Sequence, residues 1–175
     1  MNSYKASGEH IYIRFITYED TEMIVKWRNQ GNVRRYFFYR ADFTREIHLN
    51  WMKDKVETGE VVQFIICDNE SDTPIGCTYL RDIDSLEGTA EYGVFIGDEN
   101  YRGHGIGKEA LGLTLNYAWN VLKLDKVISR AISTNMASIG SFLSMGFSVD
   151  ETRKDQECSD GTKEDMVLMS IKNDR

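Results

Sequence analysis

The stretch YRGHGIGKEA, residues 101–110, places three glycines at alternate positions just before an apolar, helix-favouring segment. Glycine lacks a Cβ, so it lets the backbone take positive φ angles and approach a ligand closely. A predicted strand ends at Gly97, and a predicted helix begins near residue 105. The first amides of such a helix have no partner within it, and its dipole is positive at that end. A tight turn needs only one glycine, so the pattern predicts a phosphate-binding loop.

Three phosphate-binding motifs compete for this loop. Gly107 and Lys108 fit the end of a Walker A motif, but the hydroxyl residue after the lysine is missing and Arg102 stands where the first glycine belongs. A dinucleotide motif that starts at Gly103 needs a glycine where Lys108 stands, and the antiparallel strands expected upstream do not suit it. The remaining pattern, R-x-x-G-x-G, is filled by Arg102, Gly105 and Gly107.

The periodicity of apolar residues predicts an α+β fold (an α/β sandwich) in the order β-α-α-β-β-β-α-β-α-β-β. Expected strands span residues 10–17, 60–67, 74–83, 89–97, 125–133, 146–153 and 163–171, and expected helices span 19–29, 44–57, 108–122 and 135–145. A strand–helix–strand crossover in the second half implies at least one parallel pair. We therefore expect a mixed, mostly antiparallel sheet of about seven strands flanked by about four helices. With one proline and no repeat, residues 1–175 are predicted to form a single domain.

Composition narrows the functional class. A net charge of −7 argues against general affinity for nucleic acid or for an anionic membrane. No apolar run approaches the ~20 residues of a membrane span, and no secretory signal is visible, so we expect a cytoplasmic protein. Three cysteines without a CxxC motif predict neither a disulfide framework nor a zinc site, and the scattered histidines indicate no metal. The sequence does not decide whether the chain forms a homodimer.

Together with two further motifs, the R-x-x-G-x-G loop resembles the GNAT superfamily of N-acetyltransferases. The segment STN, residues 133–135, matches the asparagine that family members turn toward the CoA arm. The segment SFLSMGF, residues 141–147, resembles the second family signature, an aromatic residue four positions before Gly-Phe. The resemblance covers roughly residues 9–171 and includes the element order. It implies acetyl-CoA as the cofactor and transfer of an acetyl group to a primary amine.

The resemblance also assigns residues to the cofactor. In the family, the strand before the loop is splayed, and its backbone follows the pantetheine arm of CoA. This segment corresponds to Phe95, Ile96 and Gly97, with the N–H of Ile96 or a neighbour as the expected oxyanion donor. The other predicted cofactor contacts are Arg102, Gly103, His104, Gly105, Ile106, Gly107, Lys108, Asn135 and Phe142. Asn135 also fits a helix N-cap, a role compatible with an amide that faces CoA.

Acetyl transfer needs a group that accepts the proton of the amine, because roughly one molecule in a thousand of a lysine-like amine is neutral at pH 7. We predict Glu91 as this base. It stands eleven residues before Arg102, a separation at which some family members carry a glutamate base. The alternatives are a chain of water molecules, with Glu91 a rim glutamate or one half of a cross-strand ion pair.

The proton donor departs from the family pattern. Phe142 occupies the position at which family members commonly carry a tyrosine, and phenylalanine cannot donate a proton. Tyr92, Tyr117 or water could take over this role, and the sequence does not decide between them. Free thiols have pKa values near 8.5, so a thiolate leaves tolerably well at pH 7 even without a donor.

The amine acceptor is expected against residues 27–51, which we call the acceptor wall and which are rich in arginine and aromatic side chains. Arg35, Tyr36 and Phe38 are the predicted substrate-binding residues. The stretch resembles GNAT enzymes that acetylate nucleotide-linked amino sugars and, less specifically, those that modify ribosomal-protein N-termini. A small-molecule or peptide amine is therefore expected as the partner. A polyamine (spermidine-type) acetyltransferase and a non-catalytic CoA-binding sensor are the alternatives.

Overall fold

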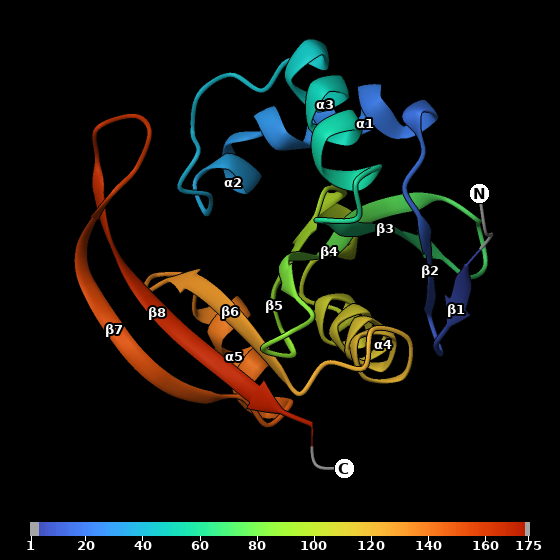
Figure 1. Ribbon diagram of the computed structural model, residues 1–175. Coiled ribbons are helices and arrows are strands. Elements are labelled where there is room, and N and C mark those ends of the chain that lie inside the picture. Colours follow the sequence, from blue (N-terminus) through green and yellow to red (C-terminus); the bar gives the residue numbers. More distant parts are fainter. Residues whose placement is uncertain (1–3, 174–175) are drawn as a thin grey trace.

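The computed structural model describes residues 4–173, and its strands form one eight-stranded sheet in the order β1-β2-β3-β4-β5-β6-β8-β7 (Figure 1). The strands are β1 Lys5–Ser7, β2 Ile11–Phe15, β3 Val62–Asp68, β4 Pro74–Asp84, β5 Thr89–Ile96, β6 Lys126–Ile132, β7 Ser148–Glu157 and β8 Lys163–Lys172. The helices are α1 Thr21–Asn29, α2 Gly31–Arg34, α3 Arg45–Trp51, α4 Ile106–Asn120 and α5 Met136–Ser144. Every neighbouring pair of strands is antiparallel except β5 and β6. The predicted α+β class and the parallel crossover are confirmed.

The structure adds two short elements that the sequence pattern did not predict. Strand β1 has three residues and α2 has four, too few for a period to show. The predicted helix 44–57 is also interrupted: α3 ends at Trp51 and continues as a π-helical turn, Met52–Val56. The sheet thus has eight strands rather than about seven, and five helices accompany it rather than about four.

Helices cover both faces of the sheet. Helices α1 to α3 lie over one face, and α4 and α5 lie over the other (Figure 1). Side chains of β3 alternate between the two cores: Phe64 and Ile66 belong to the cluster beneath α4, whereas Ile65 and Cys67 belong to the cluster beneath α1 and α3. A strand covered on both faces has no solvated side, which explains why its sequence is apolar without alternation.

The feature of the fold that positions the site is the divergence of β5 from β6. The two strands pair only from Thr89 to Tyr92 on β5. On its other side, β5 stays paired with β4 as far as Ile96, opposite Gly76. From Gly93 onward, β5 therefore has no strand partner on the side of β6, and the sheet opens there. Within residues 4–173, no helix is long and apolar enough to cross a membrane.

Candidate active site

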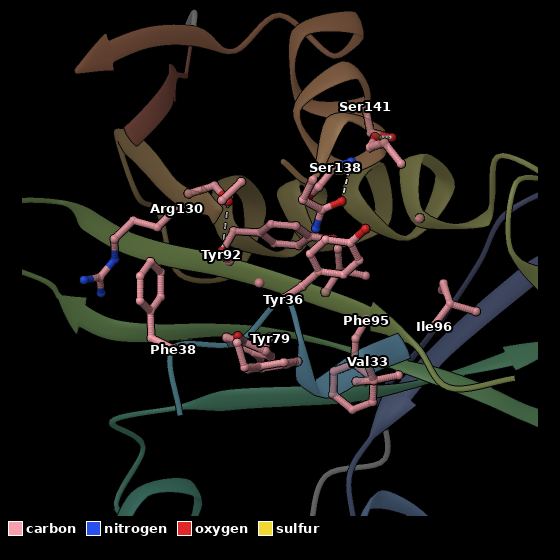
Figure 2. Close-up of a pocket in the computed structure, with 18 of the residues that line it drawn as sticks. Val33, Tyr36, Phe38, Tyr79, Tyr92, Phe95, Ile96, Arg130, Ser138 and Ser141 are labelled. Atoms are coloured by element: carbon pink, nitrogen blue, oxygen red, sulfur yellow. Dashed lines mark hydrogen bonds between the residues drawn. The ribbon is translucent and has the colours of Figure 1, made fainter. Parts of the chain in front are cut away.

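A cavity of about 880 Å³ lies where β5 and β6 diverge. Its walls come from the loop before α4, from α5, from the acceptor wall and from the β7–β8 hairpin. Figure 2 shows Ser138 and Ser141 of α5 on one side of this space and Val33, Tyr79 and Phe95 on the opposite side. The sequence-predicted loop, strand and acceptor wall thus face a single cavity.

The glycine loop has the geometry of an anion cradle. Gly103 and Gly105 have φ values of +82° and +79°, and Gly105 is the N-cap of α4. The amides of residues 103–107 donate to no group that the structure describes. A Cβ atom built on Gly103, Gly105 or Gly107 would meet nothing within 4 Å. This open row of unpaired amides at a helix N-terminus fits the pyrophosphate of CoA.

The charged residues of the loop have different surroundings. The guanidinium of Arg102 donates to the carbonyl of Ile96 over 3.1 and 2.9 Å, which ties the loop to the end of β5. Lys108 is exposed and lines the cavity, so its ammonium can reach a bound phosphate. His104 is exposed and does not line the cavity.

The free edge of β5 presents backbone amides to the cavity. The carbonyl of Tyr92 accepts a hydrogen bond from Ser129 of β6 over 3.2 Å, so the backbone groups of residue 92 face β6. Backbone direction alternates along a strand, so the amides of Val94 and Ile96 point into the opening. Gly97 is glycine for a different reason. Its Cβ would lie 2.1 Å from the Trp27 ring, and Gly97 does not line the cavity.

Helix α5 contributes the two predicted residues of the second signature. The side-chain oxygen of Asn135 accepts from the amide of Ser138 over 3.3 Å and caps the helix, and its side-chain nitrogen makes no hydrogen bond with the described residues. Phe142 is buried in the cavity wall, with its ring edge-to-face against Tyr92 at 5.9 Å and tilted against Phe147 at 5.2 Å.

The structure separates the two tyrosines that the sequence left open as proton donors. Tyr117 does not line the cavity and packs among Tyr4, Phe15 and Phe64. Tyr92 lines the cavity beside Phe142, and its buried hydroxyl lies near Thr78 but makes no well-formed hydrogen bond with residues 4–173. Burial raises the pKa of Tyr92, so the hydroxyl keeps its proton. Tyr92 is therefore the better placed of the two.

Glu91 lines the cavity but is held by two arginines. Arg81 stands directly opposite it on β4 and donates to one carboxylate oxygen through Nε at 3.0 Å. Arg130 of β6 donates to the other oxygen. The side chain of Glu91 is 11% exposed, against 42% for Arg81 and 37% for Arg130. This arrangement is the cross-strand ion pair considered as the alternative role.

The acceptor wall places all three predicted substrate residues on the cavity: Arg35, Tyr36 and Phe38. The Arg35 guanidinium lies 4.6 Å from the centroid of the Tyr36 ring. Tyr36 points from the segment after α2 toward α5 (Figure 2). The ring of Phe37 packs edge-to-face on Phe95 of β5 at 5.8 Å, so the wall touches the open strand directly.

Arg40 fastens the acceptor wall to the β7–β8 hairpin. Its guanidinium donates to Glu164 at 2.7 Å, to Thr162 at 2.8 Å and to the carbonyl of Phe37 at 3.0 Å. Its backbone amide donates to the hydroxyl of Ser159 at 2.6 Å. These contacts hold the acceptor wall against the β7–β8 hairpin.

Comparison with known proteins agrees with this geometry. Residues 10–148 match the Acetyltransferase (GNAT) domain. The chain belongs to this acetyltransferase family. The acetyltransferase is 25% identical over 167 residues to "Uncharacterized N-acetyltransferase p20" of Bacillus licheniformis, with 93% of each chain covered.

Two solved structures share the fold of this acetyltransferase. Spermidine N-acetyltransferase from Vibrio cholerae in complex with CoA and spermine has a TM-score of 0.87 at 18% identity, covering 94% of this chain and 96% of that one. Ribosomal-protein-S5-alanine acetyltransferase from Vibrio fischeri has a TM-score of 0.84 at 22% identity, covering 98% and 97%. The acetyltransferase uses acetyl-CoA as its acetyl donor, in line with its family.

Among the buried polar residues that line the cavity of the acetyltransferase and that sequence reasoning missed are Arg28 of α1 and His48 of α3. In the sequence, Arg28 looks like an ordinary basic residue in the last turn of a helix. His48 stands apart from the other histidines and belongs to no motif. His48 is buried against α1, where it contacts Thr21, and Arg28 is buried beneath Phe37 and Phe43. Neither helix pattern encodes these contacts. The imidazole of His48 stacks on Trp51 at 5.7 Å.

The surroundings of His48 fix its tautomer and its charge. The Thr21 hydroxyl donates to the carbonyl of Tyr18 at 2.7 Å, so it can only accept from Nδ1 of His48, 3.2 Å away. Nε2 therefore carries the lone pair and has no partner among the described residues. Burial lowers the pKa of His48 to about 4, so the folded acetyltransferase holds a neutral imidazole at pH 7.

Protonation of His48 should weaken the fold between pH 6.5 and 4. In this window the unfolded chain binds a proton on His48 and the folded chain does not, so the free energy of unfolding falls as pH falls. The contribution is up to about 3 kcal/mol. The free energy of unfolding can be measured by urea unfolding at pH 4.5 and 7.5. We expect it to differ less between the two pH values in His48→Asn, which preserves a donor to Thr21, than in wild type. His104→Asn changes an exposed histidine and is the control, with the same difference between the two pH values as wild type. The same difference in His48→Asn would contradict the role of His48 in this pH dependence.

Proposed function

We propose that the acetyl group passes directly from acetyl-CoA to the primary amine of a nucleotide-linked amino sugar or a protein N-terminus. The observation that carries this proposal is the single cavity in which the glycine loop, the free edge of β5 and the acceptor wall meet. The three cysteines, Cys67, Cys77 and Cys158, are buried, and none lines the cavity, so no thiol is placed to carry the acetyl group on the protein. Direct attack by the amine is therefore the supported route.

The proposal assigns protein groups to two parts of this reaction. The free amide of Ile96 or Val94 supports stabilisation of the oxyanion that forms when the amine attacks the thioester carbonyl. The Tyr92 hydroxyl, beside Phe142, supplies the proton donor that Phe142 itself lacks, so the CoA thiolate can leave as a thiol. The amine is proposed to lose its proton to water.

Glu91 as the catalytic base stays a prediction. The ion pairs favour the alternative role, because a proton on Glu91 would have to displace an interaction with Arg81 or Arg130. We expect Glu91→Gln to lower the free energy of unfolding by up to about 1 kcal/mol and to reduce kcat/KM by less than about tenfold. Thermal melts and initial rates at pH 7 measure both.

Arg130→Gln is the matched control, because it breaks the same ion pair from the other side. Similar losses in the two variants would support a structural pair. A fall of ~10²–10⁴-fold in Glu91→Gln alone, partly rescued by raising the pH, would instead establish Glu91 as the base.

The charge of the cavity argues against a polyamine acceptor. Its lining contains seven arginine or lysine side chains and two glutamates, although the whole chain carries a net charge of −7. One of these glutamates, Glu91, is already neutralised by Arg81 and Arg130. Two like charges 4 Å apart repel by about 4 kcal/mol at the effective dielectric of a protein surface. A spermidine-like cation is thus disfavoured, in contrast to the Vibrio cholerae enzyme named for it.

Release of free thiol from acetyl-CoA tests the proposed function. We expect turnover with an amino sugar, a nucleotide-linked amino sugar or an N-terminal peptide, and at least about tenfold lower kcat/KM with spermidine. A preference for spermidine would overturn the acceptor assignment, and no turnover across the whole amine panel would contradict the proposed acceptors.

A further inference from the structure

Arg28 is a buried arginine whose positive charge has no partner in the described part of the chain. The residue is 9% exposed, and its guanidinium makes no hydrogen bond or ion pair with residues 4–173. Two nearby arginines do have such partners, since Arg34 donates to Asp42 at 2.9 Å and Arg40 donates to Glu164 at 2.7 Å, whereas Arg35 is exposed to solvent. A buried charge without a counter-charge is costly, so this position needs an explanation.

Aromatic rings hold the guanidinium of Arg28 in place. Its Cζ atom lies 3.4 Å from the centroid of the Phe37 ring and 5.1 Å from that of Phe43. Cation–π contacts of this kind fix the orientation of the charge but do not satisfy its N–H donors. Burial lowers the pKa of Arg28 to about 10, so the charge remains at neutral pH. After burial, the groups with the largest effects on this pKa are Tyr79, Arg34, Cys77 and Tyr39.

The position of Arg28 connects it to the reacting end of the cavity. Arg28 lines the cavity, and the Phe37 ring that it covers packs on Phe95, next to the free edge of β5. A small molecule whose amine reaches that edge can place a second group at Arg28. A planar guanidinium with five donors matches the oxygens of a carboxylate or a phosphate.

We propose that Arg28 anchors an anion subsite that binds a carboxylate or phosphate group on the amine acceptor. The proposal rests on the proposed function and narrows it, because it requires an acceptor that carries both a primary amine and an acidic group. The same subsite would exclude polyamines, which offer only cations.

Matched pairs of acceptors test the subsite by measuring CoA release. Glucosamine 6-phosphate is compared with glucosamine, and an amino acid is compared with its amide. The wild type should prefer the anionic member of at least one pair by at least about tenfold in kcat/KM, since charge-assisted hydrogen bonds have this strength. The pair that shows the preference identifies phosphate or carboxylate as the ligand. Equal rates within both pairs would overturn the proposal.

Arg28→Gln should abolish this preference, mainly by raising KM for the anionic acceptor, so that the two members of the pair become equivalent. Arg45→Gln is the control, since Arg45 lies on α3 outside the cavity and pairs with Glu22. A preference that survives in Arg28→Gln would contradict the proposal. Thermal melts check folding, and Arg28→Met, which removes the unpaired charge but keeps an unbranched chain, serves if the glutamine variant is unstable.

Calorimetry measures anion binding at the subsite without any turnover, so it tests the subsite independently of the proposed reaction. The protein is first saturated with CoA, which fills the pyrophosphate cradle, and is then titrated with glucosamine 6-phosphate or the amino acid. We expect binding to wild type and at least about tenfold weaker binding to Arg28→Gln. If no amine is turned over but this difference persists, the proposed function has failed and the subsite stands. If CoA-saturated wild type binds neither anion, the subsite is wrong whatever the turnover.

Discussion

Replacing Gly107 with aspartate should weaken CoA binding by at least about 100-fold and leave the fold intact. Gly107 lines the cavity in the first turn of α4, and a Cβ there would meet nothing within 4 Å. A carboxylate at this position repels a bound pyrophosphate by about 4 kcal/mol per charge at 4 Å. The same carboxylate is favourable at a helix N-terminus, so the melting temperature should not fall. Isothermal calorimetry with CoA and a thermal melt measure the two effects.

Gly140→Asp is the matched control for this prediction. Gly140 lies in α5, its Cβ would also meet nothing within 4 Å, and it does not line the cavity. The control should bind CoA as wild type does. Equal CoA affinity in Gly107→Asp and wild type would mean that the pyrophosphate binds elsewhere.

Replacing Tyr92 with phenylalanine should slow turnover without destabilising the protein. The hydroxyl is buried without a well-formed hydrogen bond to the described part of the chain, so its removal deletes an unsatisfied polar group. The melting temperature should stay the same or rise. We expect kcat to fall by about 100-fold, the lower end of what a positioned proton donor contributes, because a thiolate is a tolerable leaving group. Burial keeps the pKa of Tyr92 raised, so the loss should not depend on pH between 6 and 9.

Tyr117→Phe supplies the comparison, since Tyr117 of α4 packs in the hydrophobic core and does not line the cavity. It should turn over as wild type does. If Tyr92→Phe also retains the wild-type kcat, water protonates the thiolate, and Tyr92 is only part of the wall.

The sequence predicted the elements that have a clear local signal. The glycine loop combines a strand end, positive-φ glycines and a helix start within a few residues, so its geometry is locally encoded. Strand β1 and helix α2 were missed because three or four residues carry no period. The π-helical turn after α3 was missed because the apolar spacing continues through it.

The site was less predictable where strands or helices meet. The charge partners of Glu91 depend on the register of β4 and β6 against β5, which places Arg81 directly opposite it. No motif specifies that register. The burial of Arg28 depends on Phe37 and Phe43, which reach it from the segment between α2 and α3. Such contacts arise from tertiary packing. Residue type and spacing alone therefore predict that the side chain of Arg28 is exposed to solvent.

Mass spectrometry with acetyl-CoA labelled in its acetyl group tests direct transfer most directly. After incubation with an amine that supports thiol release, the amine should carry one labelled acetyl group, and the mass of the protein should be unchanged. A labelled acetyl group on the protein that later moves to the amine would contradict direct attack. Release of labelled acetate, with the amine unmodified, would contradict acetyl transfer itself.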